Sequence, residues 1–191
     1  MPNDEQAIIA ITKRWIQEVV IGLNFCPFAA TPFEQQAIRY RVLPAPSTDD
    51  LLVALLDECQ YLDTNPSTET TLIIWRDAFH DFEAYLMLVG AAEDVLEAEE
   101  LEEAYQLASF HPDYCFVDAD ADDAANFTNR SPFPMIHILR TASVERAVNT
   151  HPDTEAIPET NINLARSKGS LEFEQILEDI RNTPIDEDLE K

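Results

Sequence analysis

The sequence predicts an α/β fold: a small, mainly parallel sheet of three or four strands, flanked by helices, in a single domain. Two observations predict it. Strand-like runs at 38–43, 70–75 and 105–110 alternate with two amphipathic helical patterns, and a chain of 191 residues suits one domain. Connections of the type strand–helix–strand are nearly always right-handed and place the strands parallel.

The first helix is predicted near the N-terminus, where apolar residues recur at steps of three and four: Ile8, Ile11, Trp15 and Val19. Gly22 and Asn24 supply its end, and a loop with Pro27 and Pro32 follows. The run 38–43 alternates apolar and basic residues, as in a strand with one buried face.

Two helices separate the three predicted strands. The first begins at Thr48 or Asp49 and ends near Leu62, and the second begins at Asp77. Between them, the run 70–75 contains three consecutive apolar residues and fits a strand that is buried on both faces. The Glu-rich run 93–103 is interpreted as a solvated helical face or hinge.

The last third of the chain is predicted to be helical. Ser131 fits an N-cap and Pro132 a first helical position, so we expect a helix from there to about Val148. A shorter helix should span roughly 158–168 and end at Gly169. We therefore expect one domain over 1–169, and an acidic extension over 170–191 that is partly disordered.

Charge and composition exclude several classes of function. The formal net charge of -25 disfavours binding to nucleic acid or to a membrane surface. The first residues lack the basic region of a signal peptide, so we expect the protein in the cytoplasm. Only three glycines are present, so neither a phosphate-binding loop nor a dinucleotide fingerprint can be built. This disfavours a P-loop NTPase and a nicotinamide-dependent dehydrogenase, and the cofactor stays unknown.

A candidate anion site is predicted within residues 109–140. In parallel sheets, ligands bind beyond the carboxyl ends of the strands, and His111 follows the third predicted strand directly. Arg130 precedes the predicted helix start at Ser131, whose free N–H groups would favour an anion. On that helix, His137 and Arg140 would share a face. Alternatively, these cations pair with nearby acidic side chains, among them Asp113, Asp122 and Asp123.

Cys26 is a candidate nucleophile. If Pro27 opened a short helix, Cys26 would stand at the N-cap, where the helix dipole lowers the thiol pKa. A nearby His111 or His137 would then complete a Cys–His pair. The alternative is a small, buried hydrophobic residue, the commoner role of a free cysteine.

Metal binding has weaker support. His111, Asp113 and His137 could supply nitrogen and oxygen ligands, but the paired histidines of a zinc helix are absent from the sequence. The run 118–122 resembles the opening of a calcium loop, and it departs from that pattern at Asp123 and Asn129. No set of metal ligands is therefore predicted.

Three stretches resemble the domain-of-unknown-function family 1415, a family of uncharacterised bacterial proteins. They are 22–29, 109–114 and 126–140, and the resemblance extends over nearly the whole chain to about Gly169. It implies that these stretches are features of the family, and it implies no activity. Their polar residues add further candidates for ligand binding: Asn24, Asp113, Tyr114, Asn126 and Asn129.

Three hypotheses follow from the sequence. The first is an enzyme or binding protein for a small anionic metabolite that carries phosphate or carboxylate. In it, Cys26, His111 and His137 are catalytic, and Arg130, Ser131 and Arg140 hold the anion. The second is a non-enzymatic interaction domain whose acidic surface binds a basic partner, and the third is a metal-dependent hydrolase. The oligomeric state is not predicted.

Overall fold

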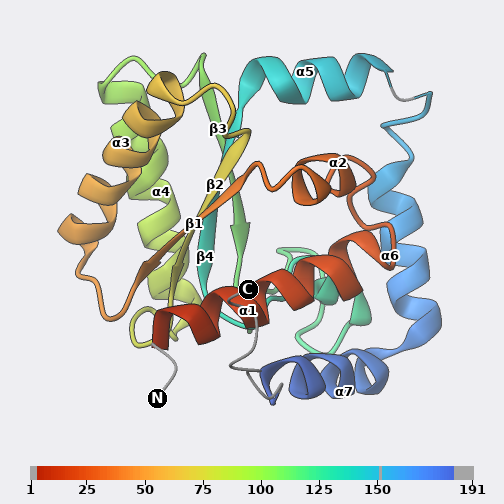
Figure 1. Cartoon of the computed structure of the whole chain (residues 1–191). Helices are drawn as coiled ribbons and strands as arrows, with labels where there is room; N and C mark the ends of the chain where they lie inside the picture. Colours follow the sequence, from red (N-terminus) through yellow and green to blue (C-terminus); the bar gives the residue numbers. More distant parts are fainter. Residues whose placement is uncertain (1–3, 151, 183–191) are drawn as a thin grey trace, which may run out of the picture.

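The computed structural model describes residues 4–150 and 152–182. A four-stranded sheet lies between two layers of helices, as Figure 1 shows. The strands are β1 (Ile38–Leu43), β2 (Thr70–Trp75), β3 (Tyr105–Phe110) and β4 (Met135–Arg140). The helices are α1 (Asp4–Trp15), the π-helix η1 (Ile16–Ile21), α2 (Ala30–Glu34), α3 (Thr48–Thr64), α4 (Phe82–Ala98), the 3-10 helix η2 (Ala124–Thr128), α5 (Thr141–Thr150), α6 (Ile157–Lys168) and α7 (Ser170–Arg181).

The sheet is mixed, with the strand order β1-β2-β4-β3. β1 and β2 are parallel, and β4 is antiparallel to both of its neighbours, β2 and β3. The α/β class is therefore confirmed, but the expectation of a mainly parallel sheet is wrong. The three predicted strands, β1, β2 and β3, nevertheless run in one direction, because β4 lies between β2 and β3 and is antiparallel to both. Their carboxyl ends therefore lie at the same end of the sheet.

β4 replaces the helix that was expected to begin at Ser131. Ile136 and Ile138 join the core on the side of α3 and α4, whereas Met135 joins the core on the side of α1. This alternation is that of a strand buried on both faces, and pairing with β2 and β3 satisfies its backbone groups. The helix in this region, α5, begins only at Thr141.

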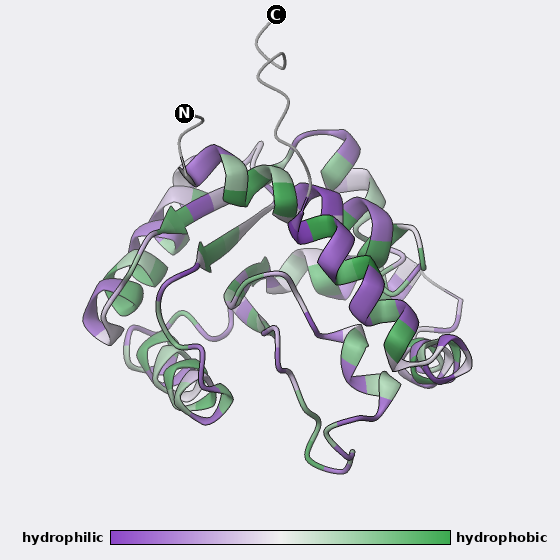
Figure 2. Cartoon of the chain, turned by 90° about the horizontal axis from the view of Figure 1, so that it is seen from below, coloured by the Kyte–Doolittle hydropathy of each residue, from purple (hydrophilic) through white to green (hydrophobic). Residues whose placement is uncertain are grey.

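The two faces of the sheet bury separate cores. On one face, α3 and α4 contribute Leu55, Leu62, Tyr85 and Leu96. The other face packs against the group of α1, η1, η2, α6 and α7. Figure 2 shows hydrophobic and hydrophilic stretches interleaved along these helices, as expected for helices that cover a sheet with one side only.

The region after Gly169 contributes to this second core. Residues 170–181, which were expected to begin an extension, form α7 and bury Phe173, Leu177 and Ile180. Gly169 ends α6 as expected, with a φ of 85° that favours glycine. Residues 183–191 of the expected acidic extension lie outside the described residues. Within the described ranges, no helix has the length and apolar character needed to cross a membrane.

Candidate functional site

His111 lies at the predicted place, directly beyond the carboxyl end of β3, and it is fully buried. Its Nε2 donates to the Phe79 carbonyl at 3.0 Å, and its Nδ1 accepts the Asp113 N–H at 3.0 Å. The rings of Phe82 and Tyr85 lie 5.3 and 4.9 Å from the imidazole. Burial lowers the His111 pKa, which keeps the ring neutral. Both nitrogens are engaged, so His111 joins the end of β3 to the loop before α4.

Asn126 has a comparable role in the loop between β3 and β4. Its side chain is fully buried; Oδ1 accepts the Phe116 N–H at 3.0 Å, and Nδ2 donates to the Asp120 carbonyl at 2.9 Å. Its own carbonyl accepts the N–H groups of Asn129 and Arg130, both at 3.1 Å. One side chain thus closes the loop on itself, as a buried amide with satisfied hydrogen bonds can do.

Arg130 is bound to the same loop. Its Nε donates to the Tyr114 carbonyl at 3.1 Å and its Nη2 to the Ala121 carbonyl at 2.8 Å. The guanidinium also stacks on the Phe127 ring, 4.5 Å from the centroid. The neighbouring Ser131 is fully buried and donates to the Phe133 carbonyl at 2.7 Å. No helix begins at Ser131, so the anion-binding helix start that was predicted there does not exist.

Arg140 ends β4 on the side of α3. Its Nη2 donates to the carbonyls of Leu62 and Thr68, at 2.6 and 3.1 Å, so it joins the end of α3 to the start of β2. His137 lies three residues earlier on the same strand. In a strand, residues three apart point to opposite faces, whereas on a helix they would share one. The expected pairing of His137 and Arg140 is therefore wrong.

The remaining predicted ligand-binding residues lie around this segment. Asn129 donates to the Ser109 carbonyl at 3.3 Å. The Tyr114 ring packs 5.2 Å from Phe82 and 5.0 Å from Phe116, measured between centroids. Asp113 is exposed, and Asn24 is an exposed turn residue with a φ of 56°.

Cys26 is half-buried in the turn after η1. The next helix, α2, has Ala29 as its N-cap, so Cys26 does not cap it. Burial raises the pKa of the Cys26 thiol, while hydrogen bonds from the N–H groups of Phe28 and Ala29 act in the opposite direction. The expected lowering of this pKa is therefore wrong. In the described part of the chain, no hydrogen bond or ring contact joins Cys26 to His111 or His137.

His137 is the predicted site residue with a free acceptor. It lies half-buried on the α1 side of the sheet, and its Nε2 is 2.6 Å from the Thr70 hydroxyl. That hydroxyl donates to the Ile138 carbonyl, so it must accept the Nε2–H of His137. Burial lowers the His137 pKa to about 4. Nδ1 is then an unprotonated acceptor that has no partner among the described residues.

A buried carboxylate on α3, Glu58, was not among the residues predicted from the sequence. Arg39 Nε donates to it at 2.6 Å, Thr71 donates at 3.2 Å, and the Arg41 guanidinium lies 4.0 Å away. The sequence carries a signal for this cluster. Glu58 lies in the apolar stripe of α3, three residues after Leu55 and four before Leu62. Arg39 and Arg41 are two residues apart on β1, so they share one face of that strand.

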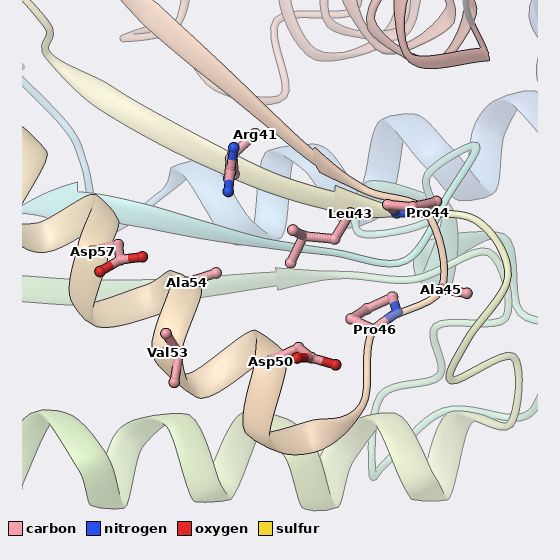
Figure 3. A pocket seen from close by; sticks show the side chains of 9 residues that line it. All are labelled: Arg41, Leu43, Pro44, Ala45, Pro46, Asp50, Val53, Ala54 and Asp57. Carbon is pink, nitrogen blue, oxygen red and sulfur yellow. The ribbon is translucent and has the colours of Figure 1, made fainter.

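A cavity of about 290 Å³ opens beside this cluster, between α3 and the carboxyl end of β1 (Figure 3). Arg41 lies on the strand side, and Asp57 lies on the helix side. Asp50, a third lining residue, is held by Ser47 in a capping box at the start of α3. The other lining residues are Leu43, Pro44, Ala45, Pro46, Val53 and Ala54. None of the residues predicted as site residues lines this cavity.

The described residues contain no group of three or more His, Cys, Asp or Glu side chains placed to hold a metal ion. His111 in particular has both ring nitrogens engaged in hydrogen bonds, so it offers no free lone pair to a metal.

A model of the family described as Protein of unknown function (DUF1415) matches residues 7–175, and the chain belongs to this family. No curated protein and no solved structure matches the chain.

Proposed function

We propose that this member of the family is a non-enzymatic interaction domain whose acidic surface binds a basic partner. One observation carries the proposal: among the described residues, most basic side chains are engaged within the molecule, whereas many acidic side chains face solvent without an ion-pair partner. Arg39, Arg130 and Arg140 bind a buried carboxylate or backbone carbonyls. At the surface, Arg14, Arg76, Arg166 and Lys168 form ion pairs.

The unpartnered acidic side chains concentrate on α4 and the turn that follows it. Eight of them are exposed: Glu83, Glu93, Asp94, Glu97, Glu99, Glu100, Glu102 and Glu103. No ion pair within the described residues involves any of these eight. A surface of one charge sign attracts a partner of the opposite sign and accelerates its association. The solvent side of α4 and the turn that follows it are therefore the proposed region of contact.

The test is binding of a fluorescent, lysine-rich peptide, measured by anisotropy at several salt concentrations. A first variant replaces Glu99, Glu100, Glu102 and Glu103 with Gln. A matched control makes the same four-charge change in the opposite layer, at Glu5, Glu34, Glu174 and Glu178, which are also exposed. We expect the first variant to weaken binding at least ten-fold more than the control. Equal weakening would mean that the peptide responds to net charge alone, which would contradict the proposal.

A second candidate function is binding and catalysis at His137, whose Nδ1 would accept a hydroxyl or amine proton of a small anionic metabolite. The specific observation in its favour is the tautomer: Thr70 accepts Nε2–H and leaves Nδ1 as a base or acceptor. A thermal-shift screen with phosphate- and carboxylate-bearing metabolites tests it, because a ligand of the native state raises the midpoint. A shift that is lost in His137→Gln and kept in His80→Gln would support this candidate. A screen without any hit would contradict it.

A further inference from the structure

The solvent side of α4 exposes apolar residues as well as acidic ones. Leu86 and Met87 are adjacent in sequence and are 45% and 71% exposed. One turn later stands Gly90, and a Cβ placed on it would meet nothing within 4 Å. We call this surface the α4 outer face; it consists of Glu83, Leu86, Met87, Gly90, Glu93, Asp94 and Glu97.

The fold does not require the apolar part of this face. The opposite side of α4 supplies the core residues Tyr85, Leu88, Ala92 and Leu96. A glycine inside a helix is unfavourable relative to alanine, and nothing packed against Gly90 within the described chain demands it. A glycine on a helix surface does permit the backbone of a second helix to approach closely, as small residues do at helix crossings.

We propose that the α4 outer face docks a basic amphipathic helix. This inference rests on the proposed function and names the partner's form. Leu86 and Met87 would receive the apolar side of the partner, and its backbone would cross α4 at Gly90. Lysines or arginines beside that apolar side would face Glu83 at one end and Glu93, Asp94 and Glu97 at the other. This is recognition of an amphipathic helix through its apolar side, with charges that select the partner.

The geometry sets the size of the partner. Residues 83–97 span about 21 Å of helix axis at 1.5 Å per residue, so a partner of four turns would cover the whole face. A second copy of the chain fits poorly, because the same acidic residues line its face. In a parallel crossing its Glu93, Asp94 and Glu97 would meet identical carboxylates, and in an antiparallel crossing they would meet Glu83; like charges in contact oppose association.

The test uses two fluorescein-labelled peptides of 18 residues, both made of leucine and lysine. One has its leucines at helical spacing, and the other has the same composition in scrambled order. Met87→Gln and Gly90→Gln are the test variants; both retain good helix formers, and the Gly90 site has space for a side chain. Leu171→Gln is the matched control, since Leu171 is an apolar residue of α7 that is 82% exposed.

We expect the amphipathic peptide to bind at least ten-fold more tightly than the scrambled one. Each test variant should weaken it at least ten-fold, while Leu171→Gln leaves it unchanged. Circular dichroism melting of the free variants checks that they fold, and Gly90→Gln should melt no lower than the parent protein.

The other outcomes separate this inference from the proposed function. If the peptide binds and the α4 variants do not weaken it, the docking face is wrong and the proposed function stands. If both peptides bind equally well, recognition of a helix is excluded. If neither binds, the proposed function fails as well. Self-association in sedimentation that is lost in Gly90→Gln would assign the face to a second copy and overturn the proposed partner.

Discussion

Residues 109–140 and the α4 outer face depart from the usual distribution of side chains in opposite ways. In the first region, polar side chains are buried: His111, Asn126 and Ser131 are inaccessible to solvent. On the second, Leu86 and Met87 are exposed. The buried polar groups have their hydrogen bonds inside the molecule, so they need no ligand, whereas the exposed apolar groups lack the contacts that burial would provide. A region rich in residues of catalytic type is therefore not by itself a binding site.

The largest effect should come from Asn126→Ala. The change leaves the Phe116 N–H and the Asp120 carbonyl without the partners that Asn126 gave them. The Asp120 carbonyl still accepts the Asp123 N–H, so the Phe116 N–H is the group left unsatisfied. That costs about 1–3 kcal/mol, and the lost hydrogen bond to Asp120 adds about 1 kcal/mol, so we expect the free energy of unfolding to fall by about 3 kcal/mol. Urea unfolding, followed by circular dichroism, measures the change.

Asn149→Ala is the matched control for that prediction. Asn149 is exposed on α5, and a surface change of this kind should stay within about 0.5 kcal/mol. If Asn126→Ala proved as mild as the control, the loop would not depend on this amide. Residues 109–140 would then be free to rearrange around a ligand, and the contrast with α4 would be lost.

The second effect is a pH dependence of stability that comes from His137. Its pKa is about 4 in the folded chain, against 6.5 for an ordinary histidine. As the pH falls below 6.5 the unfolded chain takes up this proton first, so stability is present above that pH and is lost progressively toward pH 4. The loss should be about 2 kcal/mol, somewhat less than the full shift would give because the side chain keeps partial exposure.

Urea unfolding of the parent protein and of His137→Gln between pH 7.5 and 4 measures this contribution of His137 to the free energy of unfolding. The other titrating groups are common to both proteins, so their difference isolates His137. We expect the difference in the free energy of unfolding between the two proteins to change between pH 6.5 and pH 4 and to be constant above pH 7. Parallel curves throughout would show that the imidazole is not held neutral by the fold, and they would remove the second candidate function.

The sequence predicted the three strands that run in one direction and failed on the fourth. Residues 38–43, 70–75 and 105–110 were recognised because short apolar runs stand between clear helical patterns. Pro132 and Pro134 before β4 are compatible both with the first turn of a helix and with the approach to a strand, since neither place needs their N–H. The choice between helix and strand depends on the place between β2 and β3 in the sheet, which β4 fills. That place exists only once the chain has folded.

The candidate site shows the same limit. The position of His111 at the strand edge followed from the chain alone, because a strand end is a local feature. The function of Arg140 did not, because its acceptor at Leu62 lies 78 residues away in the chain. The residue types within 109–140 indicated which side chains make specific contacts. Whether an arginine meets a ligand or a carbonyl depends on atoms that are brought near only by folding.

A smaller effect is expected for Arg130→Lys. Lysine keeps the charge but lacks the planar guanidinium that binds two carbonyls and stacks on Phe127. We expect a loss of about 1 kcal/mol in the free energy of unfolding. Arg146 is exposed and donates to the Ser143 hydroxyl, so Arg146→Lys should change little. An equal effect of the two would mean that the Arg130 hydrogen bonds do not contribute, and that its charge is available to a ligand.

The smallest effect is expected on α4, from the double variant Leu86→Gln with Met87→Gln. Neither side chain is buried in the free protein, and glutamine favours helix about as much as methionine does. We therefore expect the free energy of unfolding to stay within about 0.5 kcal/mol of the parent value. A loss above 1 kcal/mol in urea unfolding would mean that these side chains stabilise the isolated chain. They would then be core residues at the margin of α4, and their exposure would no longer need a partner to explain it.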